Sequence, residues 1–248
     1  MTAKIKDWAS SLSGCDGGNI EADTWLCGIE WGGGSSEGYY ETQLRQEIDE
    51  GAVNANLKKF DWADSITYPY GRSFAKLYTA ITNHGKVEDY AKVAELTGNE
   101  LFKLNLYPIA FDSTNHDLWH KNKLDEITGF ESKYIFNTWC LFNRFPAFAK
   151  LRREHKPKLI IGTGVDYLRD FLIFFGADEC AGNLKSGKIS DDSDANKYDR
   201  SFYWVRLDGG TLLVVIPFFS GRYGLNSNAL LQKMGERISE LMKGSSHE

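Results

Sequence analysis

A short apolar segment, residues 24–29, runs directly into a glycine-rich loop at 32–34, with Glu30 between them. The apolar run predicts a buried strand that ends at this carboxylate. Two later apolar strands end in similar chemistry, one at Asn105 and the other within residues 217–222. In an open α/β sheet, ligands bind beyond the carboxyl ends of the strands, and glycine lets the backbone approach a ligand closely. We therefore expect these three strand ends to converge on one crevice.

Strand and helix patterns alternate along the rest of the chain. The clearest strand, 158–162, turns directly into a helix at 165–175. Two apolar runs on either side of Asp208-Gly209-Gly210 predict a β-hairpin. An acidic, exposed helix is expected at 37–50. Apolar residues at helical spacing and turn signals predict further helices at 73–83, 88–97, 146–155 and 227–242. The aromatic, loop-rich segment 111–140 is expected to contain one helix near its end.

This alternation predicts an α/β fold. We expect a single three-layer domain over residues 1–248, with a mainly parallel central sheet and helices on both faces. A hairpin partner would run antiparallel at an edge of the sheet. The polar, glycine-containing residues 181–200 predict a surface loop or the tip of an excursion from the domain, and residues 244–248 predict a frayed tail. A chain of 248 residues is long enough to bury one substantial core.

The composition restricts the classes of function. A net charge of −5 and a pI of about 5.6 argue against broad non-specific affinity for nucleic acid, although they leave room for a local basic patch. No apolar stretch reaches the ~18 residues of a membrane span, and the first residues lack the apolar run of a signal peptide. We therefore expect a cytoplasmic protein without a membrane partner. The four cysteines are scattered without a Cys-x-x-Cys pair, which argues against a zinc or iron–sulfur site.

Each strand-end residue admits a functional and a structural interpretation. Glu30 could orient water or stabilise positive charge, or it could pair with a surface lysine. The Asn105 carboxamide could read the mixed edge of a nucleobase, or it could cap a loop. Ser220-Gly221-Arg222 follows a strand and could receive a phosphate, or it could be a solvated glycine loop. Gly162-Thr163-Gly164 lacks the third glycine of a dinucleotide fingerprint, so we interpret it as a tight strand-to-helix turn.

Taken in order, these strand ends resemble the motifs of the uracil-DNA glycosylase superfamily. Gly28-Ile29-Glu30-Trp31-Gly32 is similar to the family's first motif, Gly-x-Asp/Asn-Pro-x. Leu104-Asn105-Leu106 resembles the motif in which an Asn ends an apolar strand and recognises the base. Residues 218–222 correspond best to the last motif, with Phe218 where the family has His or Asn. The resemblance covers roughly residues 20–243.

The resemblance implies a role for each matching residue. Glu30 would position the attacking water, Asn105 would read the flipped base, and Tyr70 would stack on it. Phe218 would lie at the base carbonyl. The residues that would contact the nucleic-acid backbone are Gly32, Gly33, Ser220, Gly221 and Arg222.

These roles predict a DNA base-excision N-glycosylase that acts on a flipped uracil or related deaminated base by water attack at the sugar C1′. Such an enzyme requires no metal or organic cofactor, and its partner is DNA, either single- or double-stranded. The alternative is a non-catalytic nucleobase-binding, nucleic-acid-binding or regulatory protein on the same fold. A Rossmann-like enzyme that uses a free nucleotide is supported only by glycines after strands. Residues 13–18 match no motif of the family.

Overall fold

The computed structural model describes residues 3–32, 38–53, 58–82, 85–111, 117–191 and 198–244. Within these ranges, seven strands form one sheet in the order β1-β3-β2-β4-β7-β6-β5. The strands are β1 (Gly17–Gly18), β2 (Thr24–Gly28), β3 (Leu101–Asn105), β4 (Leu159–Thr163), β5 (Lys185–Ile189), β6 (Arg200–Arg206) and β7 (Leu212–Ile216).

The centre of this sheet is parallel and its edges are antiparallel. β3, β2, β4 and β7 are parallel neighbours. β1 pairs antiparallel with β3, and β6 and β5 continue antiparallel from β7. The sheet is therefore mixed, and the parallel arrangement expected from the sequence holds for its four central strands. The predicted hairpin is confirmed as β6 and β7.

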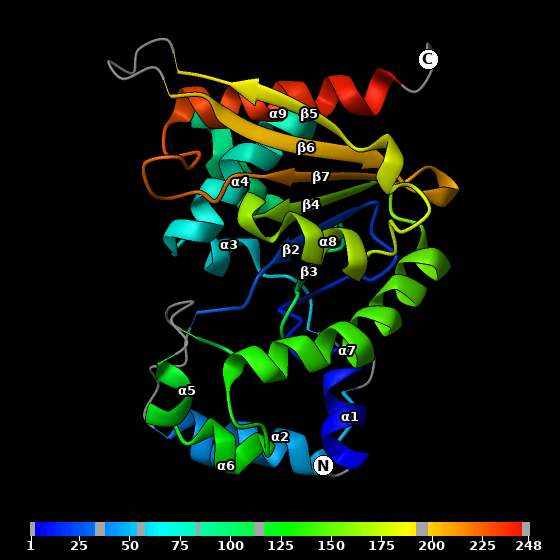
Figure 1. Ribbon diagram of the computed structural model, residues 1–248. Helices are drawn as coiled ribbons and strands as arrows, with labels where there is room; N and C mark the ends of the chain where they lie inside the picture. Colours follow the sequence, from blue (N-terminus) through cyan, green and yellow to red (C-terminus); the bar gives the residue numbers. More distant parts are fainter. Residues whose placement is uncertain are drawn as a thin grey trace.

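Helices lie on both faces of the sheet (Figure 1), as expected for three layers. α4 (Pro69–Thr82) and α9 (Asn228–Lys243) pack together on one face, and α7 (Lys133–His155) and α8 (Leu168–Phe174) cover the other. The shorter α-helices are α1 (Ala3–Ala9), α2 (Arg45–Glu50), α3 (Trp62–Ser65), α5 (Leu118–Lys121) and α6 (Leu124–Thr128). A π-helix forms at Tyr39–Leu44, and 3₁₀ segments form at Val87–Glu95, Val165–Tyr167, Ala181–Asn183 and Asp208–Gly210.

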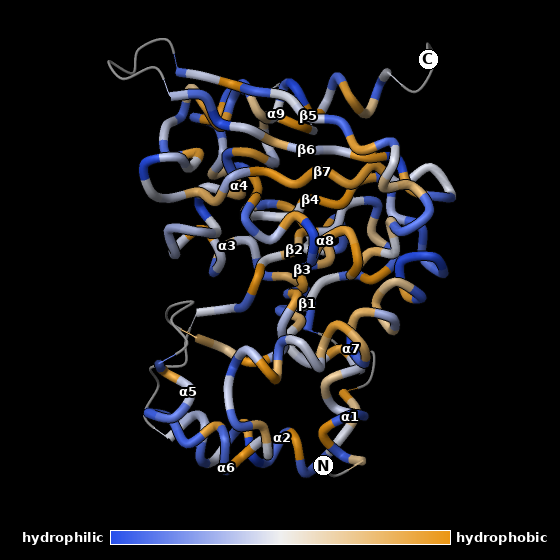
Figure 2. The backbone as a smooth tube through the Cα atoms, viewed as in Figure 1, coloured by the Kyte–Doolittle hydropathy of each residue, from blue (hydrophilic) through white to orange (hydrophobic). Residues whose placement is uncertain are grey.

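Side chains of β2 alternate between two hydrophobic clusters. Trp25 and Cys27 belong to the cluster beneath α7 and α8, whereas Leu26 belongs to the cluster beneath α4 and α9. Every residue of β2, β4 and β7 is buried, and the tube through β4 and β7 is coloured mainly hydrophobic (Figure 2). Strands covered on both faces require continuous apolar sequence, which is the pattern that predicted them.

One helix joins two that the sequence predicts separately, and another begins earlier than predicted. The helices expected near the end of 111–140 and at 146–155 form the single helix α7, which begins at Lys133 because Ser132 caps it: its Oγ accepts a hydrogen bond from the backbone N–H of Ile135 at 3.3 Å. α4 begins at Pro69 rather than at 73. Proline is favoured in the first turn of a helix, where its missing N–H removes no intrahelical hydrogen bond.

The expected surface loop at 181–200 contains an edge strand, so that prediction is wrong for Lys185–Ile189. β5 pairs antiparallel with β6, with Lys185 opposite Trp204 and Ile189 opposite Arg200. Its Lys, Ser and Gly residues have low strand propensity, and backbone pairing with β6 forms the strand. Exposed lysines are common on edge strands because they oppose further pairing. Residues 245–248 of the expected tail lie outside the described residues.

Candidate functional site

The C-terminal ends of β2 and β3 lie side by side. Gly28 is the register partner of Asn105, and the Leu106 N–H donates to the Gly28 carbonyl at 3.0 Å. Beyond the strands, the Tyr107 N–H donates to the Ile29 carbonyl at 2.9 Å. The two segments therefore stay paired as they leave the sheet, which places Glu30 and Asn105 at the same edge.

The Glu30 carboxylate forms an ion pair with Lys133 at the start of α7. Both carboxylate oxygens lie 2.9 Å from Nζ, and the side chains are only 5% and 3% exposed. The ammonium also lies 3.7 Å from the centre of the Phe111 ring. Burial raises the pKa of the Glu30 carboxyl above its usual range, although the Lys133 charge opposes this rise. This site therefore holds a carboxylate that is fixed in place and largely shielded from water.

Asn105 is buried, and hydrogen bonds hold both its side chain and its backbone. The carboxamide Nδ2 donates to the Gly14 carbonyl at 2.9 Å, and the backbone carbonyl of Asn105 accepts from Arg144 Nη2 at 2.9 Å. The amide nitrogen must face Gly14, because a carbonyl oxygen only accepts hydrogen bonds. The amide oxygen lies where a Cβ at residue 28 would be, so only glycine fits beside it at Gly28.

Tyr70 and Phe218 lie together on the α4 side of this edge. The Tyr70 hydroxyl lies 2.9 Å from Thr163 Oγ1 at the end of β4, and burial raises the pKa of this phenol. Its ring centroid is 5.7 Å from that of Phe218 and 5.1 Å from that of Phe219. Lys103 Nζ lies 5.4 Å from the centroid of the Tyr70 ring. The Tyr70 ring is thus packed among its neighbours, and Phe218 is 42% exposed.

The loop after β7 carries the expected phosphate-binding residues on the surface. Ser220, Gly221 and Arg222 are all exposed, and Gly221 has a φ of 82°, a conformation that favours glycine. The Arg222 guanidinium lies 4.3 Å from the centre of the Tyr198 ring. Two glycines after β2 were also expected to contact the nucleic-acid backbone. Of these, Gly32 is exposed and Gly33 lies outside the described residues.

These contacts place the expected site residues in three separate environments. Glu30 is tied to α7 through Lys133, whereas Tyr70 and Phe218 contact each other on the α4 side. Asn105 lies between β2 and the segment at 13–18.

The sequence did not indicate Lys133, because it lies 103 residues from Glu30 and only folding brings the two together. Thr163 is the polar last residue of an apolar strand, as Asn105 is. A search for polar residues at the ends of apolar strands could therefore have found it.

The segment at 13–18 supports Asn105. Gly17 and Gly18 form β1 beside β3, and Asp16 forms an ion pair with Lys103. Gly18 has a φ of 103°, and a Cβ there would overlap the Leu101 carbonyl, so the close strand pairing requires glycine. This pairing places the Gly14 carbonyl against the Asn105 side chain.

Within the described ranges, no group of three or more His, Cys, Asp or Glu residues is placed to hold a metal ion. In the same ranges, the helices are all too short or too polar to cross a membrane. Comparison with known proteins gave no matching family model and no match among curated proteins. The resemblance to the uracil-DNA glycosylase superfamily therefore stays a prediction from the sequence motifs.

Proposed function

We propose that this chain is an N-glycosylase that removes uracil or a related deaminated base from DNA. The observation that carries the proposal is the buried Glu30 carboxylate, held by Lys133 at the end of β2 and beside the end of β3. A carboxylate fixed in a poorly hydrated site stabilises positive charge more strongly than one in water. The sugar of a departing nucleobase develops such a charge as the bond at C1′ breaks.

In this mechanism the remaining residues bind and orient the nucleotide. Asn105 directs its amide nitrogen to Gly14, so its oxygen, which lies beside Gly28, is the atom that would accept from an N–H on the edge of the base. Phe218 supplies an exposed aromatic surface, and Ser220, Gly221 and Arg222 offer exposed backbone and a cation for flanking phosphates. Glu30 accepts a hydrogen bond from the attacking water and orients it towards C1′. As the C1′–N bond breaks, its electron pair leaves with the base, and the water oxygen forms the new bond to C1′. The proton released from this water passes to Glu30 or to solvent, and the departing base takes a proton from solvent.

The variant Glu30→Gln tests this proposal. We expect excision to fall by about 10²–10⁴-fold, because the variant loses the charge and keeps the shape. Oligonucleotides with uracil, hypoxanthine or a mismatch are incubated with each protein, and alkali then reveals abasic sites. Glu126→Gln, which changes an exposed glutamate on α6, is the matched control and should retain full activity. Equal excision by wild type and Glu30→Gln would refute the assignment.

Two observations favour a second function, binding of a base or nucleic acid without cleavage. Both Glu30 oxygens contact Lys133, and the Tyr70 ring is packed against Phe218 and Phe219. A paired carboxylate activates water less readily than one that is unpaired. The same oligonucleotides decide between the two functions: salt-dependent binding without abasic product would select the binding protein.

A further inference from the structure

Three residues form an aromatic platform on the surface beside β6 and β7. They are Tyr198, which precedes β6, and Arg222 and Tyr223, which follow β7. The Tyr198 and Tyr223 rings meet edge to face, with their centroids 5.5 Å apart. The Arg222 guanidinium lies 4.3 Å from the centre of the Tyr198 ring and 5.7 Å from that of Tyr223. Tyr223 is 61% exposed, so the aromatic platform offers a flat ring to solvent beside a cation.

A buried arginine fixes the aromatic platform in place. Arg200, the first residue of β6, is only 2% exposed. Its Nη1 donates to the Tyr198 carbonyl, and its Nη2 donates to the Arg222 carbonyl at 3.5 Å. The loop after β7 is braced further, because the Asn226 carboxamide donates to the Gly221 carbonyl at 2.9 Å. The aromatic platform is therefore held in one arrangement before a ligand binds, which lowers the entropy cost of binding.

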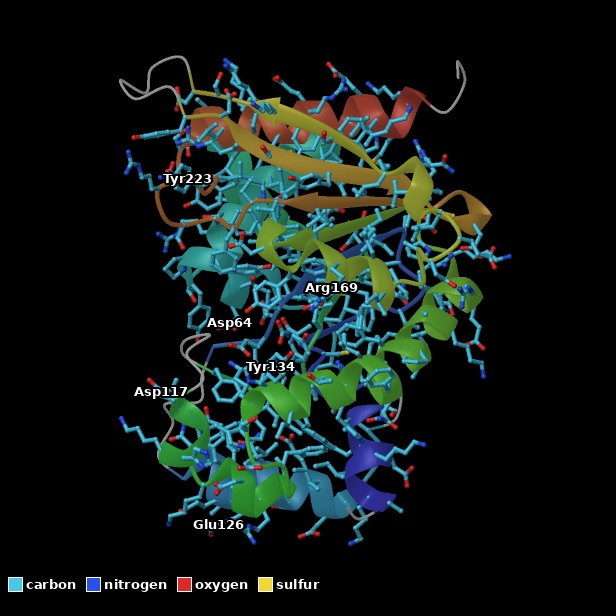
Figure 3. The ribbon with its side chains drawn as sticks, in the orientation of Figure 1. Asp64, Asp117, Glu126, Tyr134, Arg169 and Tyr223 are labelled. Atoms are coloured by element: carbon cyan, nitrogen blue, oxygen red, sulfur yellow. The ribbon has the colours of Figure 1, made fainter. Side chains whose placement is uncertain are left out.

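The aromatic platform lies at the edge of the sheet where the parallel strands end, next to the candidate site. The loop after β7 also carries Phe218, which is 42% exposed and contacts Tyr70. Tyr68, two residues before Tyr70, is 60% exposed. Figure 3 shows Tyr223 on this loop, apart from Tyr134 on α7. Exposed aromatic side chains thus continue from the candidate site to the aromatic platform.

A ring beside a guanidinium matches the chemistry of a nucleotide whose base is unpaired. The base can stack on the Tyr223 ring, and Arg222 can pair with a phosphate of the same strand. Within the part of the chain that the structure describes, no carboxylate pairs with Arg222, so its charge faces solvent. In a duplex, neighbouring base pairs cover the faces of each base, so a stacking side chain cannot reach them. A net charge of −5 also favours binding by stacking over the neutralisation of many phosphates.

We propose that the aromatic platform binds single-stranded DNA beside the base held at the candidate site. Tyr223 stacks on an unpaired base, Arg222 contacts a phosphate, and Tyr198 holds the guanidinium in position. This inference rests on the proposed function, since it names the form of DNA that is the substrate. It adds Tyr198 and Tyr223, which the excised base and the reaction at C1′ do not require.

Fluorescence anisotropy with a short labelled thymidine oligonucleotide and with a hairpin duplex tests the proposal. We expect the wild type to bind the single strand more tightly than the duplex. Tyr223→Ala should weaken single-strand binding by about 5-fold or more, the loss expected for one stacked base, whereas Tyr223→Phe keeps the ring and should bind as wild type. Tyr134→Ala, which removes a 70% exposed tyrosine from α7, is the matched control and should also bind as wild type. Equal or tighter binding of the duplex, or undiminished binding by Tyr223→Ala, would overturn the proposal.

The salt dependence of single-strand binding tests the Arg222 contact separately. In a plot of the logarithm of the binding constant against that of salt concentration, Arg222→Gln should reduce the slope by about 0.7, the value for one phosphate contact on a single strand. Arg237→Gln, which changes an exposed arginine that pairs with Glu240 on α9, should leave the slope unchanged. An unchanged slope in Arg222→Gln would contradict the contact between this arginine and a phosphate.

Excision assays separate failure of this inference from failure of the proposed function. With uracil in a single strand at low concentration, we expect Tyr223→Ala to release less base than wild type and Tyr134→Ala to release as much. Abasic product that does not depend on Tyr223 would overturn the inference and leave the N-glycosylase proposal in place. Single-strand binding that depends on Tyr223, without abasic product, would overturn the N-glycosylase proposal and support the inference.

Discussion

The ion pair of Glu30 and Lys133 is the least hydrated charge pair at the strand-end site. Both side chains are at least 95% buried, and the ammonium also lies over the Phe111 ring. A buried pair contributes little net stability compared with apolar residues of the same size, but loss of one partner leaves an uncompensated charge. The pair therefore constrains Glu30 strongly, and Lys133 determines whether the carboxylate can stay ionised.

Replacement of this lysine gives a pH-dependent loss of stability. We expect Lys133→Met to lower the free energy of unfolding by about 3–5 kcal/mol near neutral pH. Burial already raises the pKa of Glu30 above 4.5, and removal of the cation raises it further. The folded state then holds the proton more tightly than the unfolded state, so stability is higher in mild acid and falls as pH rises through the raised pKa. Urea unfolding in mild acid and near neutral pH measures the difference in the free energy of unfolding between Lys133→Met and wild type.

A second Lys–Glu pair provides the control. Lys123 and Glu41 lie 2.6 Å apart but are 58% and 55% exposed. Lys123→Met should cost far less stability than Lys133→Met, because water screens exposed pairs. Equal losses for the two lysine variants would show that the Glu30 pair is solvated in solution.

The sequence predicted where these polar residues would lie but not what they would contact. Strand-end position alone placed Glu30 and Asn105 at one edge, because parallel strands end together. The partners Lys133 and Gly14 could not be predicted, since they come from distant segments whose approach depends on packing. Tyr70 was expected to stack on a base, yet local sequence does not reveal that Phe218 and Phe219 pack against it.

At the scale of elements, α4 and α9 approach closely at a single glycine. A Cβ at Gly235 of α9 would overlap the Cβ of Ala80 on α4. In an exposed helix, Gly→Ala stabilises by about 1 kcal/mol because glycine loses more backbone entropy on folding. Here the close contact of the two helices reverses that preference.

We therefore expect Gly235→Ala to destabilise the fold by about 1–3 kcal/mol, the usual effect of adding a methyl group to a packed interface. Gly244→Ala is the control, since a Cβ at Gly244 meets no atom within 4 Å and the backbone there has negative φ. Thermal unfolding followed by circular dichroism measures the melting temperatures of both variants. A higher melting temperature for Gly235→Ala would show that α4 and α9 are less closely packed than described.

Elements with a plain apolar period were predicted well, and those without one were not. β2, β4 and β7 are continuous apolar runs, and α9 carries a regular apolar stripe. The continuity of α7 was not predicted: separate helices were expected near the end of 111–140 and at 146–155, because Lys133 and Arg144 are buried, Phe142 is exposed and Pro146 lies inside the helix. In this helix two charged residues are buried and apolar residues lie on the outer face. The usual rule that apolar residues mark the buried face and polar residues the exposed face therefore does not apply.

At the scale of the whole molecule, Arg144 joins three separate parts of the chain. This fully buried residue of α7 donates through Nε to the Leu106 carbonyl at 2.8 Å and through Nη2 to the Asn105 carbonyl at 2.9 Å. Its Nη1 donates to the Ala9 carbonyl at the end of α1 at 2.7 Å and to the Ser11 carbonyl just after α1 at 3.3 Å. The planar guanidinium thus connects α7, the end of β3 and the segment after α1. Because that segment also supplies the Gly14 carbonyl that bonds the Asn105 side chain, Arg144 helps to hold the candidate site in position.

Arg144→Lys tests this connection. An ammonium keeps the charge but lacks the planar set of donors, so some of the buried carbonyls lose their hydrogen bonds. Each unsatisfied group costs about 1–3 kcal/mol, and we expect a total loss of about 3 kcal/mol or more in urea unfolding. Arg237→Lys, at an exposed arginine that pairs with Glu240 at 2.9 Å, should change stability by less than about 0.5 kcal/mol. The NMR signals of the Asn105 carboxamide should also shift in Arg144→Lys, because the Gly14 carbonyl moves. Unchanged stability and unchanged carboxamide signals would mean that the segment after α1 holds its position without Arg144.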